Sequence, residues 1–247
     1  VAKQFGAEFE FGAVTNIRKE GDRFHLTTEF GDEFTALSVI VTSGGEARKL
    51  GVPGEQELAG AGVSYCAVCD GAFFKDKDIA VVGGGDSALE EGEYLTRYGS
   101  KVYLIHRRDE FRASPSLVER FDESEKTEKV LDSVVEEIVG DGKVSAVRVK
   151  NKVTGEVSEI PVEAVFPFVG FTPYSDIFDE GMVESDASGH IITDQKMESK
   201  TPGIFVAGDV RSQFTRQIAT VARVSDYVRQ IGSRGADVEV VNRLNTQ

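Results

Sequence analysis

Apolar and polar residues alternate along the first part of the chain, as they do in half-buried β-strands. The alternation runs through AEFEFGAVTNIRKEG and RFHLTTEF, and the stretch DEFTALSVIVTSGG contains an apolar run over residues 38–42. Alternation places every second side chain on one face of a sheet, whereas a short continuous apolar run suits a strand covered on both faces. We therefore predict a small antiparallel unit that leads into a buried strand.

The period of the pattern changes after residue 77. DIAVVGGG predicts a strand, DSALEEGEYLTRYG predicts a helix closed by Gly99, and KVYLIHRRD predicts a second strand. A strand, a helix and a strand in this order form the βαβ unit of a parallel sheet. Beyond it the pattern predicts a helix after Pro115, strands in LDSVVEEIVGDG, VSAVRVKNKVTGEVSEIPV and AVFPFVG, a buried strand over residues 204–207, and a helix that continues to Gly232.

Two turn-rich stretches, GGEARKLGVPGEQELAGAG and FTPYSDIF, are candidate linkers within this pattern. The chain has 247 residues, 40% of them hydrophobic and 28% charged, which suits an ordinary globular protein with two modest domains. The order of elements predicts an α/β fold.

The net charge of the chain limits the kinds of partner that we expect it to bind. A net charge of −14 repels phosphate backbones and anionic membranes, so we expect neither nucleic acid nor a membrane as a partner. No apolar run approaches the ~20 residues needed to cross a bilayer, and the chain does not begin with a signal-peptide pattern, so we expect a cytoplasmic protein.

Residues 83–88 read GGGDSA and fit G-x-G-x-x-A between a predicted strand and a predicted helix. Gly83 permits a tight turn, Gly85 lets the backbone approach a pyrophosphate, and the small Ala88 allows close packing of helix on strand. Asp86 and Ser87 open the helix, whose free N–H groups attract phosphate. A purely structural glycine turn is the alternative.

The next predicted strand ends in His106, Arg107 and Arg108, with Arg112 four residues later. An acidic residue at this place would bind the ribose 2′-hydroxyl of NAD, whereas arginine binds the 2′-phosphate of NADP. On a chain this acidic, the cluster favours NADPH over an ordinary group of salt bridges.

Cys66 and Cys69 are the only cysteines and form a C-x-x-C pair. A structural zinc site needs four ligands, and the three histidines, His25, His106 and His190, are scattered, so we expect no metal. Two small buried residues are a second alternative. The favoured interpretation is a dithiol that cycles to a disulfide, with Asp70 beside it as a candidate acid–base group. Because thiols do not readily accept hydride directly, an NADPH turn together with a dithiol implies a flavin intermediary.

The chain resembles the low-molecular-weight thioredoxin reductases of the flavoprotein disulfide reductase class. The resemblance rests on RKLGVPGE, GVSYCAVCDGAFF, VVGGGDSALEEG, HRRDEFRAS, VFPFVGFTP and TPGIFVAGDVRSQFTRQ, which occur in the family's order over nearly the whole chain. It implies two Rossmann-like, three-layer domains. Residues 47–172 would bind NADPH and be inserted into a discontinuous FAD domain of residues 1–46 and 173–247.

The resemblance also implies a homodimer that passes electrons from NADPH through FAD to the cysteine pair and on to thioredoxin. Cys69 would face the flavin, Cys66 would attack the thioredoxin disulfide and Asp70 would serve as acid. The remaining cofactor-binding residues that it implies are Ser87, Ala88, Arg107, Arg108 and Arg112 for NADPH, and Gly208, Asp209, Arg216 and Gln217 for FAD.

The sequence departs from the family in three places. The family's first βαβ unit, which holds the FAD pyrophosphate, does not precede Val1, so we expect the chain as given to bind FAD poorly. VTSGG replaces the usual Ala-Thr-Gly, and Arg223 stands where small residues are usual near the flavin. Two alternatives stay open: the reductase of a peroxiredoxin system, and a flavin-free NADPH-binding module that senses redox state.

Overall fold

The computed structural model describes residue 4, residues 8–212 and residues 238–241. It divides into two compact units. Residues Ala47–Gly170 form the continuous unit, and Val1–Glu46 together with Phe171–Gln247 form the discontinuous unit. Each has its own hydrophobic core.

A parallel sheet of four strands forms the centre of the continuous unit, in the order β12-β6-β7-β8. From Ile79 to its last residue, every residue of β6 is buried, because layers cover both faces of the sheet, which explains the uninterrupted apolar sequence of this strand. The strands are β6 (Asp78–Gly83), β7 (Lys101–Ile105), β8 (Thr127–Val130) and β12 (Ala164–Phe168).

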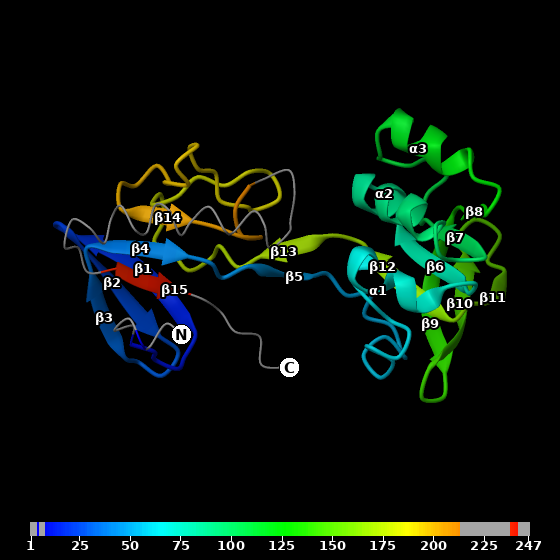
Figure 1. Ribbon diagram of the computed structural model, residues 1–247, viewed down its shortest axis with the longest axis horizontal. Coiled ribbons are helices and arrows are strands. Elements are labelled where there is room, and N and C mark those ends of the chain that lie inside the picture. The colour runs from blue at the N-terminus through cyan, green and yellow to red at the C-terminus, as the bar shows by residue number, and fades with distance from the viewer. Residues whose placement is uncertain (1–3, 5–7, 213–237, 242–247) are drawn as a thin grey trace. The chain divides into compact units, whose positions relative to one another are not determined.

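Short helices cover one face of this sheet, and an antiparallel sheet of order β11-β10-β9 covers the other (Figure 1). Successive residues of β6 separate accordingly: Ile79 and Val81 pack with the helices, and Ala80 and Val82 pack with the antiparallel sheet. The elements are α1 (Ala67–Asp70), η2 (Gly71–Phe74), α2 (Asp86–Leu95), α3 (Pro115–Asp122), β9 (Ser133–Gly140), β10 (Val144–Asn151) and β11 (Val157–Pro161).

Helix α2 ends earlier than its sequence predicts. It stops at Leu95 with Thr96 as the C-cap, and the Thr96 hydroxyl donates to the carbonyl of Glu93 at 2.6 Å. Gly99 lies beyond the cap and is closely packed, because a β-carbon there would come within 3.0 Å of Ile79 Cδ1. The expected glycine cap is therefore wrong, and the glycine serves helix–sheet packing instead.

The discontinuous unit combines an antiparallel sheet of order β1-β2-β3 with a parallel sheet of order β14-β4-β15. The predicted antiparallel unit and buried strand are both present, and every residue of β4 is buried. The elements are β1 (Val14–Glu20), β2 (Arg23–Thr28), β3 (Glu33–Ala36), β4 (Ser38–Val41), β14 (Ile204–Val206) and β15 (Val238–Val241), with β5 (Gly45–Ala47) paired to β13 (Phe171–Pro173).

The α/β class with parallel sheets is confirmed. Within the described ranges, no helix has the length and apolarity required to cross a membrane. The helix predicted up to Gly232, and with it Arg216, Gln217 and Arg223, lies outside the described residues.

Candidate active site

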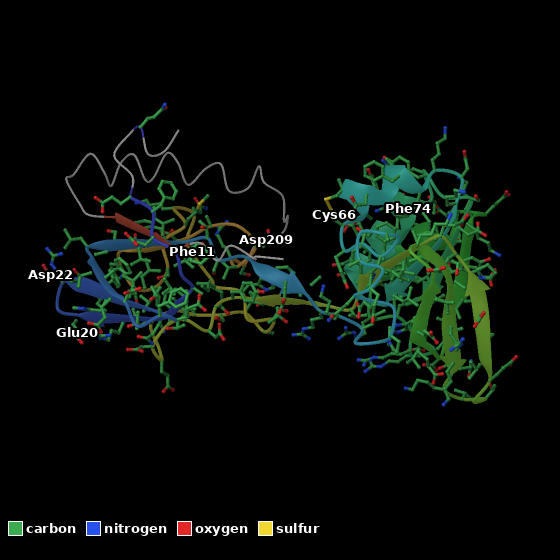
Figure 2. The ribbon with its side chains drawn as sticks, turned by 90° about the horizontal axis from the view of Figure 1, so that it is seen from below. Phe11, Glu20, Asp22, Cys66, Phe74 and Asp209 are labelled. Carbon is green, nitrogen blue, oxygen red and sulfur yellow. A yellow bond between two sulfur atoms is a disulfide. The ribbon has the colours of Figure 1, made fainter. Side chains whose placement is uncertain are left out.

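Cys66 and Cys69 form a disulfide at the start of α1, with an S–S distance of 2.04 Å and a Cα–Cα distance of 5.3 Å. Cys66 is the N-cap of this short helix, and its Sγ accepts a hydrogen bond from the backbone N–H of Cys69 at 3.2 Å. One helical turn brings residues three apart onto the same face, which explains why this spacing closes a ring. Cys69 is exposed and Cys66 half-buried; Figure 2 shows Cys66 at the edge of the continuous unit.

Asp70 is held in place by a serine that precedes the cysteines. The Ser64 hydroxyl donates to Asp70 Oδ2 at 2.6 Å and accepts from the backbone N–H of Cys66 at 3.2 Å. Ser64 is 7% exposed, so its polar group needs these partners. The candidate acid and the first cysteine therefore share one hydroxyl group.

A buried carboxylate fixes the segment that leads to the cysteines. Glu55 is 1% exposed, and its carboxylate accepts from the backbone N–H groups of Leu50 and Gly51 and from the hydroxyl of Tyr65, at 2.7 to 2.9 Å. Burial, and then the hydrogen bond to Glu55, raise the pKa of Tyr65. The phenol next to Cys66 thus stays a neutral hydrogen-bond donor.

Two exposed apolar side chains lie close to the cysteines in the sequence. Val68 is 51% exposed and Phe73 is 80% exposed. Phe74 instead turns inward and packs edge-on against Phe166, with ring centroids 5.8 Å apart. Exposed aromatic and aliphatic groups beside a reactive disulfide suit a protein partner better than a small polar one.

The glycine turn after β6 has the tight packing that its sequence predicts. A β-carbon at Gly83 would lie 2.6 Å from that of Ala88 and 2.5 Å from the carbonyl oxygen of Phe168. Gly85, in contrast, faces open space: a β-carbon there would have no neighbouring atom within 4 Å, and this glycine is the N-cap of α2. The turn therefore leaves room for a ligand where the helix begins.

His106 lies underneath this turn. His106 is 6% exposed, and its ring contacts Phe111 and bonds through Nε2 to the carbonyl oxygen of Glu110 at 3.0 Å. Burial is the main cause that lowers its pKa, and the charges of Arg108 and Arg107 act in the same direction. His106 is thus a neutral, buried group that supports the turn.

The arginines lie on an exposed loop that is tied to the glycine turn. The backbone N–H of Arg112 donates to the carbonyl of Gly84 at 2.8 Å. The Asp86 carboxylate accepts from both the N–H and the hydroxyl of Ser114, at 2.8 and 3.2 Å. Because β6 and β7 are parallel neighbours, their carboxyl ends place the turn and the loop side by side.

Three guanidinium groups on this loop are available to an anion. Arg107, Arg108 and Arg112 are exposed, and among the residues that the structure describes none of the three forms an ion pair with a carboxylate. Ser87 is exposed at the first turn of α2. These groups and the open space at Gly85 fit a dinucleotide phosphate.

Gly208 and Asp209 belong to the discontinuous unit and follow β14 after one residue, Ala207. Gly208 has a φ of +78°, a conformation that favours glycine, and its carbonyl accepts from the N–H of Arg211 at 3.0 Å. Asp209 is half-buried at the carboxyl end of a parallel strand; Figure 2 labels it. Nucleotide ligands in α/β folds bind at such strand ends.

The structure thus brings together the glycine turn and the arginine loop, and it places the disulfide on a separate element of the same unit.

The sequence analysis did not identify three residues that support the site, Ser64, Glu55 and Ser114. A serine six residues before Asp70 carries no recognisable local signal, whereas the buried Glu55 lies in the motif RKLGVPGE. In the described part of the chain, no group of three or more His, Cys, Asp or Glu side chains could hold a metal ion.

Comparison with known proteins agrees with this geometry. Residues 2–225 match the family described as pyridine nucleotide-disulphide oxidoreductase. The thioredoxin reductase of Listeria innocua is 48% identical over 220 residues, which cover 89% of this chain and 68% of that protein. The thioredoxin reductase of Bacillus subtilis is 47% identical over 220 residues, covering 89% of this chain and 69% of that protein.

Solved structures give the same result. The crystal structure of thioredoxin reductase from Streptococcus pyogenes superposes with a TM-score of 0.83 at 42% identity, covering 94% of this chain and 77% of that one. Thioredoxin reductase from Giardia duodenalis has a TM-score of 0.84 at 36% identity, covering 94% and 78%. The chain belongs to the pyridine nucleotide-disulphide oxidoreductases and, within them, to the low-molecular-weight thioredoxin reductases.

Proposed function

We propose that the chain transfers electrons from NADPH, through FAD, to the Cys66–Cys69 disulfide and on to oxidised thioredoxin. The observation that carries this proposal is the closed C-x-x-C disulfide, with Asp70 beside it, in the same unit as a dinucleotide-type glycine turn. The relatives named above, all thioredoxin reductases, support the substrate.

The continuous unit is the proposed NADPH domain. The pyrophosphate would lie at Gly85 and Ser87, against the N-terminus of α2, where backbone N–H groups and the helix dipole attract anions. Arg107, Arg108 and Arg112 would hold the 2′-phosphate, since guanidinium groups bind phosphate through paired hydrogen bonds. Asp86 and His106 would act indirectly, because their side chains already bond within the loop and under the turn.

The discontinuous unit is the proposed FAD-binding part. FAD, when bound, accepts hydride from the nicotinamide and passes an electron pair to a disulfide. Gly208 and Asp209 would hold its phosphate and ribityl region, and Arg216 and Gln217 are proposed beside its ring. The exposed Cys69 is the cysteine proposed to face the flavin. Dimerisation of two copies is part of the same proposal.

Cys66 is the proposed nucleophile toward thioredoxin. Its thiolate would attack the partner disulfide, Cys69 would then displace the reduced partner, and Asp70 would carry the proton between thiols. Val68 and Phe73 would lie in the contact surface, where their exposed apolar area would be buried.

The test is NADPH-dependent reduction of oxidised thioredoxin in the presence of added FAD, with visible absorption of the purified protein as a measure of retained flavin. Cys66→Ser should abolish thioredoxin reduction and leave flavin reduction by NADPH intact. Cys69→Ser should instead accumulate a mixed disulfide between Cys66 and thioredoxin. Turnover of thioredoxin by Cys66→Ser would contradict the assignment of Cys66 as nucleophile. A mixed disulfide between thioredoxin and Cys69 in that variant would show that the two cysteines have the opposite roles.

A further inference from the structure

Ser64 lies before the cysteine pair, in a segment that is hydrogen-bonded to the central sheet of the continuous unit. Val63 forms a parallel bridge with Val165 of β12, and the N–H of Ser64 donates to the carbonyl of Val165 at 3.0 Å. The N–H of Val165 in turn donates to the carbonyl of Gly62 at 2.8 Å. Residues 62–64 therefore continue the central sheet, and the backbone that carries the Ser64 hydroxyl is held by this sheet.

The hydroxyl connects two groups of the redox centre. A serine hydroxyl has one proton to donate and lone pairs to accept with. The carboxylate of Asp70, at 2.6 Å, is the better acceptor for that proton than the carbonyl of Cys66, at 3.5 Å. The lone pairs accept from the N–H of Cys66 at 3.2 Å.

The hydrogen bond from Ser64 uses only one of the two carboxylate oxygens of Asp70. Ser64 engages Oδ2 of Asp70, and within the described ranges no hydrogen bond is made by Oδ1. The N–H of Asp70 also donates to the carbonyl of Cys66 at 3.1 Å. One oxygen of Asp70 is thus anchored, and the other has no hydrogen-bond partner among the described residues.

We propose that Ser64 is a positioning residue that aims the Asp70 carboxyl group at the reacting sulfurs. This inference rests on the proposed function, in which Asp70 is the acid–base group. During exchange, the Cys66 sulfur bonds to one sulfur of the partner disulfide, whose S–S bond breaks. Asp70 takes the proton released by the enzyme's thiols and gives it to the departing partner thiolate.

The second half of the exchange restores the starting carboxylate. Cys69 attacks the Cys66 sulfur of the mixed disulfide, the enzyme's disulfide closes and the second partner thiolate leaves with a proton. The enzyme dithiol is oxidised and the partner disulfide is reduced by two electrons, with two protons transferred. Ser64 exchanges no proton in this sequence, and it acts only by holding Asp70.

The test compares two disulfides that differ in their need for a proton. An alkyl disulfide, hydroxyethyl disulfide, releases a thiolate that must be protonated at neutral pH, whereas the aromatic disulfide of Ellman's reagent releases a stable thiolate. The chain is reduced, freed of reductant and mixed with each probe. Ser64→Ala should slow exchange with the alkyl probe about tenfold, less than the roughly 10²- to 10⁴-fold that a whole general acid supplies. Exchange with the aromatic probe should not change.

Three further variants make the comparison specific. Ser64→Thr keeps the hydroxyl and should retain the parent rate, and Ser64→Gly should repeat the effect of Ser64→Ala. Ser133→Ala is the matched control, because Ser133 is also buried in this unit and donates to a backbone carbonyl, that of Leu131. Its rates should equal those of the parent.

The Asp70→Asn background separates this inference from the proposed function. If Asp70→Asn slows alkyl exchange and Ser64→Ala adds nothing to it, Ser64 acts through Asp70. The positioning role of Ser64 is overturned if Ser64→Ala slows exchange with both probes equally, or if it slows alkyl exchange by the same factor in the Asp70→Asn background. In either case the assignment of Asp70 as the acid is unaffected. If Asp70→Asn leaves alkyl exchange unchanged, the acid assignment and the inference built on it both fail.

Discussion

The imidazole of His106 lies directly against the α-carbon of Gly84. A β-carbon at position 84 would come within 2.1 Å of His106 Cε1 and 2.2 Å of Nδ1. The glycine in the middle of the turn is therefore required by a protein side chain beneath it, whereas Gly85, next in the chain, faces open space. The two adjacent positions thus favour glycine for different physical reasons: close packing at Gly84 and open space for a ligand at Gly85.

Gly84→Ala should destabilise the protein. The added methyl group cannot fit beside a ring that is itself fixed by Phe111 and the Glu110 carbonyl, and overpacking of this kind costs about 1–3 kcal/mol. Urea denaturation of parent and variant measures the loss. An unchanged midpoint would mean that the ring moves aside without cost.

Gly85→Ala is the matched variant for binding. Gly85 has φ −102° and ψ 179°, which alanine also adopts, so the added methyl group causes no backbone strain. Alanine is a poorer helix N-cap than glycine, so the free energy of unfolding should fall by about 1 kcal/mol or less. Its methyl group would occupy the space proposed for the pyrophosphate, and NADPH affinity should fall at least tenfold, roughly 1.4 kcal/mol. Equilibrium titration with NADPH tests this, and unaltered binding would remove the phosphate from this end of α2.

His106 predicts how stability responds to acid. Its pKa in the folded protein is lowered, mainly by burial, from an ordinary value of 6.5. The unfolded chain therefore takes up a proton below pH 6.5 while the folded protein does not, so stability is full above that pH and falls as the pH drops toward the lowered value. Urea unfolding at pH 7.5 and pH 5.5 should show a smaller acid loss in His106→Asn than in the parent. Equal losses in both would contradict a buried neutral imidazole.

Replacement of Arg107 and Arg108 by alanine should remove the preference for NADPH over NADH. Charge-assisted hydrogen bonds contribute ~1.5–3 kcal/mol, so the double variant should bind NADPH roughly 100-fold more weakly. NADH lacks the 2′-phosphate, and its affinity should hardly change. Arg97→Ala is the control, since Arg97 is an exposed arginine of the same unit that packs over Tyr94. Equal affinity of the parent for the two nucleotides would refute the assignment.

Glu55→Gln should destabilise the segment before the cysteines. The carboxylate accepts three hydrogen bonds in a buried place, and an amide group offers one oxygen where two are used, which costs about 1–3 kcal/mol. Glu57→Gln, two residues away and exposed, should be neutral. Chemical denaturation of both variants makes the comparison, and a neutral Glu55→Gln would show that the site adapts to the amide.

The sequence by itself determined the features that depend on neighbouring residues. Strand alternation and the βαβ order follow from local periodicity. The packing of Gly83 on Ala88 follows from the small size of the residues on the two sides of the turn between β6 and α2. The closure of the cysteine pair follows from a spacing of three residues. Motif order also predicted the family.

Tertiary structure decided the features that depend on residues far apart in the chain. Asp86 bonds to Ser114, 28 positions away, and His106 lies under Gly84 because two parallel strands end side by side. Gly99 packs against Ile79 of β6 instead of capping α2, and this contact also joins residues that are far apart in the chain. Local patterns record which residues are buried but not which partners they meet, since those partners are set only when the sheet and its two covering layers come together.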